Sequence, residues 1–420
     1  MEPIILTEFE PKTVELTREE YLILIKRFKD KIGVIPCIEE GKYELLPQQF
    51  VGTIALPVHS IIIQPKIPML SFFYMLVYSY EIPEFGKSLY FFEQEQGIYE
   101  IIVAKFVQEI EKLVKMGVYK SYWTSEENLP VVKGRILIDS NERINMIQRQ
   151  RAFCRFSDFT SDIIENRVLK YTLYRLSFLR FRDPFLKAKI NMLLHYFDPV
   201  SFEVIRDAHF DLVNGSYTRL NEHYRPLIRI SRILIENISL SLQKQGKVSF
   251  WSFLVDMNKL FQRFVTVCLL NLREWDVRSE TVYHWDVKGY TKIRPDMVIR
   301  KDKEVKLVLD AKYKHIDLEQ LELHGDDIRQ IGDYCATLGL KKGVLVYPKS
   351  FQQQKIHDFT IEKKDPITNR VYHVLLRTID LTSTDMKTFT AVCNQFLTQI
   401  EEILCSLTND SPNLFQNGGD

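Results

Sequence analysis

Two carboxylates and one amine, near the ends of two apolar segments, are the residues of this sequence best suited to catalysis. Asp296 lies within residues 293–300 (IRPDMVIR), and Asp310 and Lys312 lie near the end of residues 305–314 (VKLVLDAKYK). Both segments are rich in β-branched and other apolar residues, which predicts two strands. Side chains alternate faces along a strand, so Asp310 and Lys312 point to the same side.

The turn between these strands decides whether Asp296 joins that side. Residues 301–304 (KDKE) are polar and predict a tight connection between antiparallel strands. A three-residue loop places Asp296 directly opposite Asp310. A four-residue loop places them on opposite faces, because a slip of one residue turns the strand over. The sequence leaves both registers open.

Two facing carboxylates repel each other and call for a compensating charge. Mg²⁺ would supply it, since this hard cation prefers oxygen ligands and keeps water in its remaining positions. With Lys312 beside Asp296 and Asp310, the set suits hydrolysis of a phosphodiester, in which the metal activates a water and the ammonium stabilises developing negative charge. The alternative is that the two acids are ordinary strand-end charges and the lysine a solvated edge residue.

These residues resemble a known family. Residues 294–296 (RPD), followed by residues 309–314 (LDAKYK), resemble the core of the PD-(D/E)xK nuclease superfamily. More narrowly, they are similar to McrC, the nuclease subunit of modification-dependent McrBC-type restriction systems. The resemblance continues in order over most of residues 50–350, through residues 51–54, 61–67, 128–135, 159–162, 166–170, 260–265 and 327–334. This ordered set is far more specific than the short site motif.

The resemblance implies a DNA endonuclease that hydrolyses double-stranded DNA with Mg²⁺. Asp296 and Asp310 would bind the metal, and Lys312 would position the attacking water or stabilise the transition state. Gln330 and Tyr334, four residues apart on one face of a predicted helix, would support the site.

The resemblance also implies a protein partner, a GTP-hydrolysing AAA+ ring of McrB type that recognises DNA carrying a modified base of the methylcytosine type. The amino-terminal half of this chain would dock into that ring and stimulate its GTP hydrolysis. The sequence contains no Gly-x-x-x-x-Gly-Lys-Ser/Thr loop. GTP would therefore be bound by the partner and not by this chain.

Position 262 departs from the pattern expected of this family. Glu is expected there, where it would add a carboxylate near the metal, but the chain has Gln262, which keeps an acceptor oxygen and loses the charge. A second metal ion is therefore left open, as are two other functions: a regulator of the ring with a weakened nuclease core, and a nuclease that acts without any NTPase. His284, His315 and His324 are near the site in sequence and are interpreted as structural or solvated.

The composition is that of an ordinary soluble globular protein. The chain has 420 residues, 45% hydrophobic and 26% charged, with a net charge of +1. The six Cys are scattered without C-x-x-C spacing, which argues against zinc and disulfides and suits a reducing cytoplasm. No signal-peptide pattern opens the sequence, and the longest apolar run, residues 69–80, is too short to span a bilayer.

An α/β multidomain protein with three domains is expected at this length. We predict a β-rich N-terminal docking domain (1–97), a mainly helical middle region (98–245), a PD-(D/E)xK nuclease domain (246–408) and a flexible tail (409–420). In the first, Thr17 and Glu20 form a capping box for a helix from residue 18 to about 31. The remaining expected elements there are strands near residues 4–9, 43–46, 50–56 and 60–64, and a helix from residue 69.

The nuclease domain is expected to begin with an amphipathic helix and to continue as a three-strand meander, a helix and a further strand. This order is that of the superfamily core. The expected bounds are 252–275 for the first helix, 277–285, 294–300 and 305–313 for the meander, 326–338 for the second helix, and 343–347 and 371–378 for later strands.

In the middle region, helices are expected at residues 98–116 and 163–181, with a strand or hairpin at 131–138 between them. Many arginines occur between residues 143 and 182, interleaved with aromatic residues. They predict either a face that contacts DNA phosphates or amphipathic helices with solvated arginines, and the neighbouring acids favour the second. Asp158, Asp162, Asn166 and Arg167 are interpreted as helix caps and an ion pair within the domain.

Overall fold

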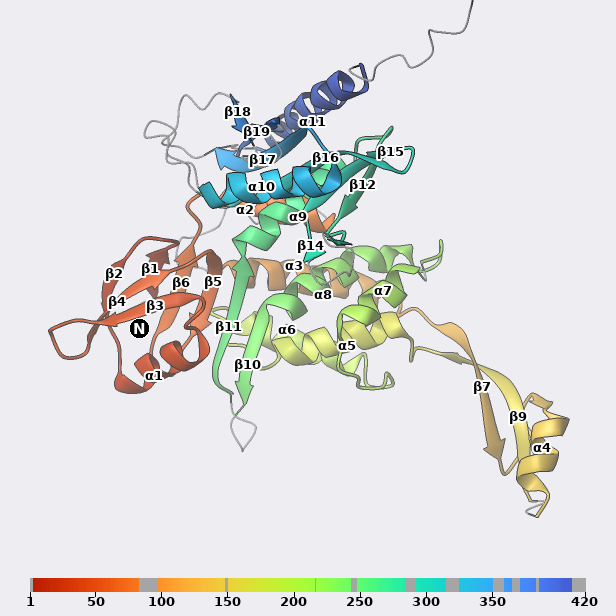
Figure 1. The fold of residues 1–420 in the computed structure, drawn as a ribbon. Coiled ribbons are helices and arrows are strands. Elements are labelled where there is room, and N and C mark those ends of the chain that lie inside the picture. Colours follow the sequence, from red (N-terminus) through yellow and green to blue (C-terminus); the bar gives the residue numbers. More distant parts are fainter. Residues whose placement is uncertain are drawn as a thin grey trace, which may run out of the picture. The chain divides into compact units, whose positions relative to one another are not determined.

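The computed structural model describes residues 3–82, 97–147, 150–215, 217–242, 248–284, 292–314, 325–349, 359–364, 371–382 and 385–409. They fall into two compact units, Met1–Glu84 with Leu254–Asp420, and Phe85–Phe253 (Figure 1). The first unit therefore unites segments that the sequence analysis assigned to separate domains. The boundaries at residues 97, 245 and 408 stay predictions, and residues 410–420 of the predicted tail lie outside the described part.

The N-terminal segment of the first unit is built from short strands and two helices. Strands β1 (Ile4–Thr7), β6 (Ser60–Gln64) and β5 (Phe50–Ala55) are neighbours, with β1 parallel and β5 antiparallel to β6. A second sheet has the order β2 (Lys12–Glu15), β4 (Lys42–Pro47), β3 (Ile32–Pro36). The predicted capping box is confirmed, since Thr17 and Glu20 bond each other's backbone at the start of α1 (Arg18–Arg27).

The apolar run at residues 69–80 forms helix α2 (Met69–Tyr80), most of which is buried. It packs against α9 (Met257–Leu269), whose first turn is capped by the Asp256 side chain. The predicted start of α9 at residue 252 is wrong, because residues 248–256 form strand β11 (Val248–Asp256). None of the described helices combines the length and apolarity needed to cross a bilayer.

A six-stranded mixed sheet forms the C-terminal part of this unit (Figure 1). Strands β12, β15 and β16 form the antiparallel meander, β17 and β19 continue it in parallel with β16, and β18 closes the far edge antiparallel to β19. Their bounds are β12 (Asp276–Ser279), β15 (Met297–Lys301), β16 (Glu304–Ala311), β17 (Lys342–Lys349), β18 (Phe359–Lys364) and β19 (Val371–Asp380). The predicted order of helix, meander, helix and strand is confirmed.

Helix α9 packs on this sheet, as do α10 (Gly325–Leu338) and α11 (Met386–Asn409), of which the sequence analysis did not predict α11. Helix α10 approaches closely over Gly343, where an added Cβ would lie 2.8 Å from Cys335 Sγ and from Ile331 Cγ1. Val298 and Val308 of the meander lie in the core beneath α10. Alternation along the strands puts Asp310 on that same face of the sheet.

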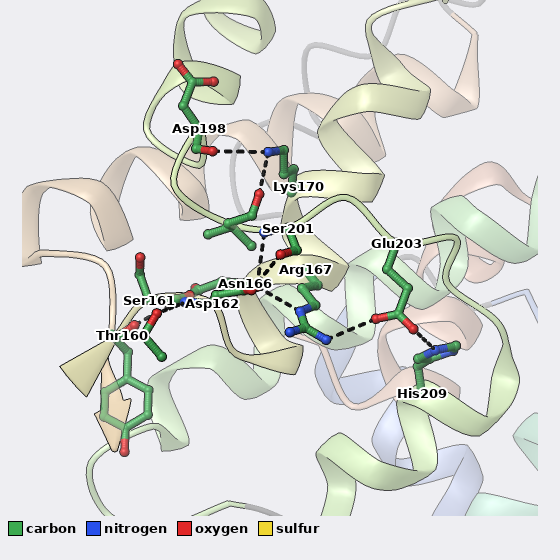
Figure 2. Close-up of polar contacts among 12 residues, drawn as sticks. Thr160, Ser161, Asp162, Asn166, Arg167, Lys170, Asp198, Ser201, Glu203 and His209 are labelled. Carbon is green, nitrogen blue, oxygen red and sulfur yellow. Dashed lines mark hydrogen bonds and ion pairs between the residues drawn. The ribbon is translucent and has the colours of Figure 1, made fainter. Parts of the chain in front are cut away.

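The second unit contains the helices α3 (Ile98–Met116), α5 (Ile164–Leu176), α6 (Pro184–His195), α7 (Asp207–Gly215) and α8 (Arg225–Asn237), and a β10 (Ile238–Leu242)–β11 hairpin. The prediction for residues 98–116 is confirmed, and the second predicted helix ends at residue 176. Asp162 and Arg167 form the predicted ion pair at 2.8 Å, with Arg167 also pairing with Glu203 and Ser201 bonding to Asp162 (Figure 2). Burial opposes ionisation, but these donors lower the pKa of Asp162 to about 2.

An antiparallel pair, β7 (Ser121–Leu129) and β9 (Ala152–Thr160), lies between α3 and α5 and was not predicted at this length. We call residues 121–160 the arm, which also contains β8 (Arg135–Ile136) and α4 (Ile138–Asn145). Of the strand predicted at 131–138, only the two residues of β8 are confirmed. Gly134 has a φ of +69°, and a Cβ there would collide with the Arg155 carbonyl, so this glycine allows a close approach to the backbone of β9.

Candidate active site

The β15–β16 hairpin sets the register of the two candidate metal ligands. Asp302 and Lys303 both have positive φ, at +53° and +70°, and form a two-residue turn between the paired residues Lys301 and Glu304. Neither predicted loop length is therefore correct. A β-bulge beyond Arg300 then shifts the register by one residue, so that Met297 pairs with Leu309. The turn and bulge together give the register of the three-residue loop, which places Asp296 opposite Asp310.

Asp296 directly precedes β15 and is held at both carboxylate oxygens. Its Oδ1 accepts a hydrogen bond from Gln262 Nε2 at 2.9 Å, and its Oδ2 accepts one from the Ala311 amide at 2.9 Å. The first donor comes from α9 and the second from the end of β16. Gln262, the position that departs from the family pattern, is therefore in direct contact with the site.

Asp310 is buried, with 1% of its surface exposed. Lys312 Nζ lies 2.6 Å from its Oδ2. Within the described part of the chain, neither carboxylate oxygen receives a hydrogen bond of good geometry. Buried carboxylates are costly unless they are hydrogen-bonded, paired or bound to a metal. Asp310 thus has acceptor capacity that this chain leaves unused.

The electrostatics of the pair favour a bound cation. Burial, together with the neighbouring Asp310 carboxylate, raises the pKa of Asp296 to about 7. Burial also raises the pKa of Asp310, and the Lys312 ammonium offsets this only in part. Burial alone would lower the pKa of Lys312, but Asp310 outweighs it and raises that pKa. One lysine therefore does not neutralise two buried acids, and a divalent cation fits the remaining charge.

The two predicted supporting residues on α10 form a chain of hydrogen bonds that begins at Lys312. Lys312 Nζ donates to Gln330 Oε1 at 3.0 Å, and Gln330 Nε2 donates to Tyr334 Oη at 2.6 Å. Tyr334 Oη in turn donates to the Arg294 carbonyl at 3.4 Å, just before Asp296 in the chain. The five residues predicted from the sequence are therefore brought together by β15, β16 and α10.

Comparison with known proteins identifies the family. The family described as "McrBC 5-methylcytosine restriction system component" matches residues 45–348, more than half of the chain. The chain belongs to this family. The resemblance to McrC stated from the sequence is confirmed.

Two relatives of this McrBC-family chain are similar over most of its length. It is 22% identical over 307 residues to the type IV methyl-directed restriction enzyme EcoKMcrBC of Escherichia coli (strain K12), over 68% of this chain and 87% of the relative. A solved half-complex from a tetradecameric assembly of Thermococcus gammatolerans McrB AAA+ hexamers with bound McrC matches with a TM-score of 0.60 and 20% identity, over 96% of this chain and all of that chain. This second likeness shows a shared fold.

Beside the site lies a buried acid that the sequence analysis did not single out. Asp327 of α10, 3% exposed, accepts hydrogen bonds from Lys314 at 2.9 and 3.1 Å and from Tyr347 Oη at 3.0 Å. Its place three residues before Gln330 on one helix face was the available signal. Among the described residues, no group of three or more His, Cys, Asp and Glu side chains is arranged to hold a metal. The site therefore offers two carboxylates and not a closed cage.

Of the three histidines that are near the site in sequence, only His284 belongs to the part of the chain that the structure describes. His284 is exposed in β13 (Tyr283–His284), which pairs with β14 (Lys292–Ile293). His315 and His324 lie outside the described residues. The prediction that they are structural or solvated stays a prediction for these two.

Proposed function

We propose that this chain is the nuclease subunit of a McrBC-type, modification-dependent restriction system, with a PD-(D/E)xK core that cuts double-stranded DNA. The observation that carries the proposal is the buried Asp310 carboxylate, which lies opposite Asp296, is ion-paired through Oδ2 to Lys312, and has no hydrogen-bond donor to its Oδ1 among the described residues. Family membership makes DNA carrying a modified cytosine the substrate of choice.

Asp296 and Asp310 would hold a Mg²⁺ ion, because their oxygens are hard ligands. Burial raises the pKa of both carboxyl groups, and a cation between them would favour their ionised forms. When bound, the metal supplies Lewis-acid polarisation of a phosphoryl oxygen and a water of lowered pKa. Gln262 and the Ala311 amide orient Asp296, which leaves its outer lone pairs for the metal. Gln262 adds no charge, so we propose a single metal ion.

Lys312 contributes the fixed positive charge of the site. Its ammonium is anchored between Asp310 and Gln330 and stays protonated, since its pKa is raised. A fixed cation beside the scissile phosphate stabilises the negative charge that develops as water attacks. Gln330 and Tyr334 hold the lysine in place through their own hydrogen bond.

The partner we propose is a GTP-hydrolysing AAA+ ring of McrB type, like the hexamers named in the solved relative. The arm supplies a surface suited to docking, since it lies in the amino-terminal half and exposes Tyr122 by 72%, Trp123 by 63% and Phe159 by 59%. The Tyr122 and Phe159 rings lie side by side across the two strands, tilted by 44° with their centroids 5.0 Å apart, and Trp123 points to the other face of the strand pair. Exposed aromatic side chains are enriched at protein interfaces.

Lys312→Ala tests the nuclease assignment. The change should lower the rate of Mg²⁺-dependent cleavage of a cytosine-methylated plasmid by about 100-fold or more, because a fixed transition-state charge is lost. Stimulation of the partner's GTP hydrolysis should stay unchanged. Lys306→Ala is the matched control, because it removes an ammonium of the same strand, one that pairs with Glu304. This variant should cut normally. Equal cleavage by the two variants would overturn the site assignment.

A second function, regulator of the ring with a weakened nuclease core, is favoured by one observation. Gln262 occupies a position where a carboxylate would complete the metal site, and its side-chain amide donates a hydrogen bond to Asp296 instead. Stimulated GTP hydrolysis by the wild-type complex without any cleavage of methylated plasmid in Mg²⁺ would establish this function in place of the first.

A further inference from the structure

One side chain next to Lys312 is tied to the far end of the sequence. Tyr313 Oη donates a hydrogen bond of 2.6 Å to Glu8 Oε1. Both residues are buried, with Tyr313 5% exposed and Glu8 fully covered. A buried carboxylate is expensive to keep in a protein interior. The contact joins the N-terminal strands to the strand end that carries Lys312, within one compact unit.

Glu8 is itself rigidly placed. Its amide continues the β1–β6 ladder by donating to the Gln64 carbonyl at 3.0 Å. Its Oε1 also accepts from the Lys66 amide at 2.7 Å, while no described residue donates to its buried Oε2. Burial outweighs these bonds and raises the pKa of Glu8 to about 7. The Gln64 carbonyl therefore fixes the backbone of Glu8, and the Lys66 amide fixes its carboxyl group.

Tyr313 is the middle residue of a tight turn at the end of β16. The Lys312 amide donates to the Val346 carbonyl at 2.8 Å, and the Lys314 amide donates back to the Lys312 carbonyl at 3.0 Å. Three successive side chains are then held by three different groups: Lys312 by Gln330, Tyr313 by Glu8, and Lys314 by Asp327. The two outer anchors both belong to α10. Among the described residues of the N-terminal segment, Glu8 is the one that bonds to this turn.

We propose that Glu8 is a positioning residue of the nuclease site, which fixes the backbone at Lys312 through Tyr313 and so holds the ammonium against Asp310. The inference rests on the proposed function. It makes the N-terminal segment part of the catalytic machinery, in addition to any role in docking. Such a role demands accuracy, because a misplacement of about 1 Å can lower a rate by about 100-fold.

The test uses four variants of the full chain in complex with its partner. Tyr313→Phe removes the donor, Glu8→Leu removes the acceptor, and the double variant removes both, while Glu8→Gln keeps an acceptor oxygen in place. We expect the first two to lower kcat for cleavage by about tenfold with little change in KM. The double variant should be no slower than the slower single variant, and Glu8→Gln should restore most of the rate.

Tyr372→Phe is the matched control, since Tyr372 is a tyrosine of β19 buried to the same degree, 6% exposed, in the core of the sheet. It should leave kcat unchanged. A loss of kcat in the double variant equal to the product of the two single losses would overturn the proposal, because the effects of two residues that act through one contact are not additive in free energy. Unchanged kcat in both single variants would overturn it as well.

A readout without cleavage separates this inference from the proposed function. Amide hydrogen exchange, followed by mass spectrometry, should speed up in peptides covering residues 311–314 of Tyr313→Phe and Glu8→Leu, with exchange in β19 unchanged. Absence of cleavage by the wild-type complex would refute the proposed function alone. Exchange in residues 311–314 that matches the wild type would refute the role of Glu8, whatever the cleavage result.

Discussion

At the scale of single residues, the site is explained by a shortage of positive charge. Asp296 and Asp310 face each other in a buried setting, and one ammonium, that of Lys312, serves both. The grouping of Asp310 with Lys312, and of Gln330 with Tyr334, was predictable from strand and helix periodicity, whereas the place of Asp296 depended on a register that the sequence left open. Glu8 was not predictable, since nothing local marks a contact with Tyr313 across 305 positions. Burial of both groups appears only once the chain has folded.

The raised pKa of Asp296 predicts how stability depends on pH in the metal-free chain. The folded state, with a pKa of about 7, binds a proton more tightly than the unfolded state, whose value is 3.8. The stability that this one group contributes should therefore fall as pH rises through this window and be absent above it. Thermal unfolding in a chelator should show a melting temperature that drops between roughly pH 5 and roughly pH 8.

Asp296→Asn should remove much of this drop, and Glu8, whose pKa is also raised to about 7, should account for another part with the same sign. Millimolar Mg²⁺ should restore the melting temperature of the wild type at the higher pH and have little effect at the lower one, because protons compete with the metal. A wild type and an Asp296→Asn variant with the same pH dependence would contradict this account.

At the scale of elements, long helices with clear periodicity were predictable and irregular strands were not. Residues 98–116 and 325–338 follow apolar spacing closely and form α3 and α10. Strand β7 (SYWTSEENL) has no apolar alternation, since the arm buries little on either face, so the periodicity gave no signal. The two-residue turn with its bulge could not be predicted from the sequence either, because it gives the strands the same register as a three-residue loop.

Close packing of α10 over β17 is predicted to control the site. Gly343→Ala places a Cβ 2.8 Å from Cys335 and Ile331, so α10 must move away from the sheet. We expect a loss of about 1–3 kcal/mol in the free energy of unfolding, typical of overpacking. The rate of cleavage should fall further than the lower fraction of folded protein explains, because Gln330 and Tyr334 move with the helix.

Gly33→Ala in β3 is the control for this change, since an added Cβ there lies 3.6 Å from Leu46, an ordinary contact. Denaturant unfolding and plasmid cleavage at a temperature where both variants are folded measure the two effects. A Gly343→Ala variant that cuts at the wild-type rate would show that the position of α10 does not matter to the chemistry.

At the scale of the whole molecule, two compact units contain the features on which the proposed function of this McrBC-family chain rests. The first unit contains the whole candidate site, built from residues as distant as Glu8 and Tyr334. The second contains the arm with its exposed aromatic residues. The sequence did not show that residues 1–84 and 254–420 form one unit, because local patterns define elements but not which distant segments pack together.

The arm is predicted to carry partner recognition. Trp123→Ala should weaken stimulation of the partner's GTP hydrolysis, with the midpoint concentration raised by about tenfold, because exposed aromatic residues dominate many interfaces. Phe185→Ala is the control, since Phe185 lies in the same unit on α6 and is 75% exposed. A titration of GTP hydrolysis against each variant measures the effect. Equal midpoints for the two variants would remove the arm from the docking surface.

The central claim, that Asp310 and Asp296 hold the cation used to cut DNA, is tested most directly by Asp310→Asn in one assay. The complex with the partner is given GTP, Mg²⁺ and a cytosine-methylated plasmid, and both GTP hydrolysis and strand cleavage are followed. Asp310→Asn keeps the size of the side chain and removes one metal ligand, so we predict full stimulation of GTP hydrolysis with no cleavage. Cleavage by Asp310→Asn at the wild-type rate would contradict the account.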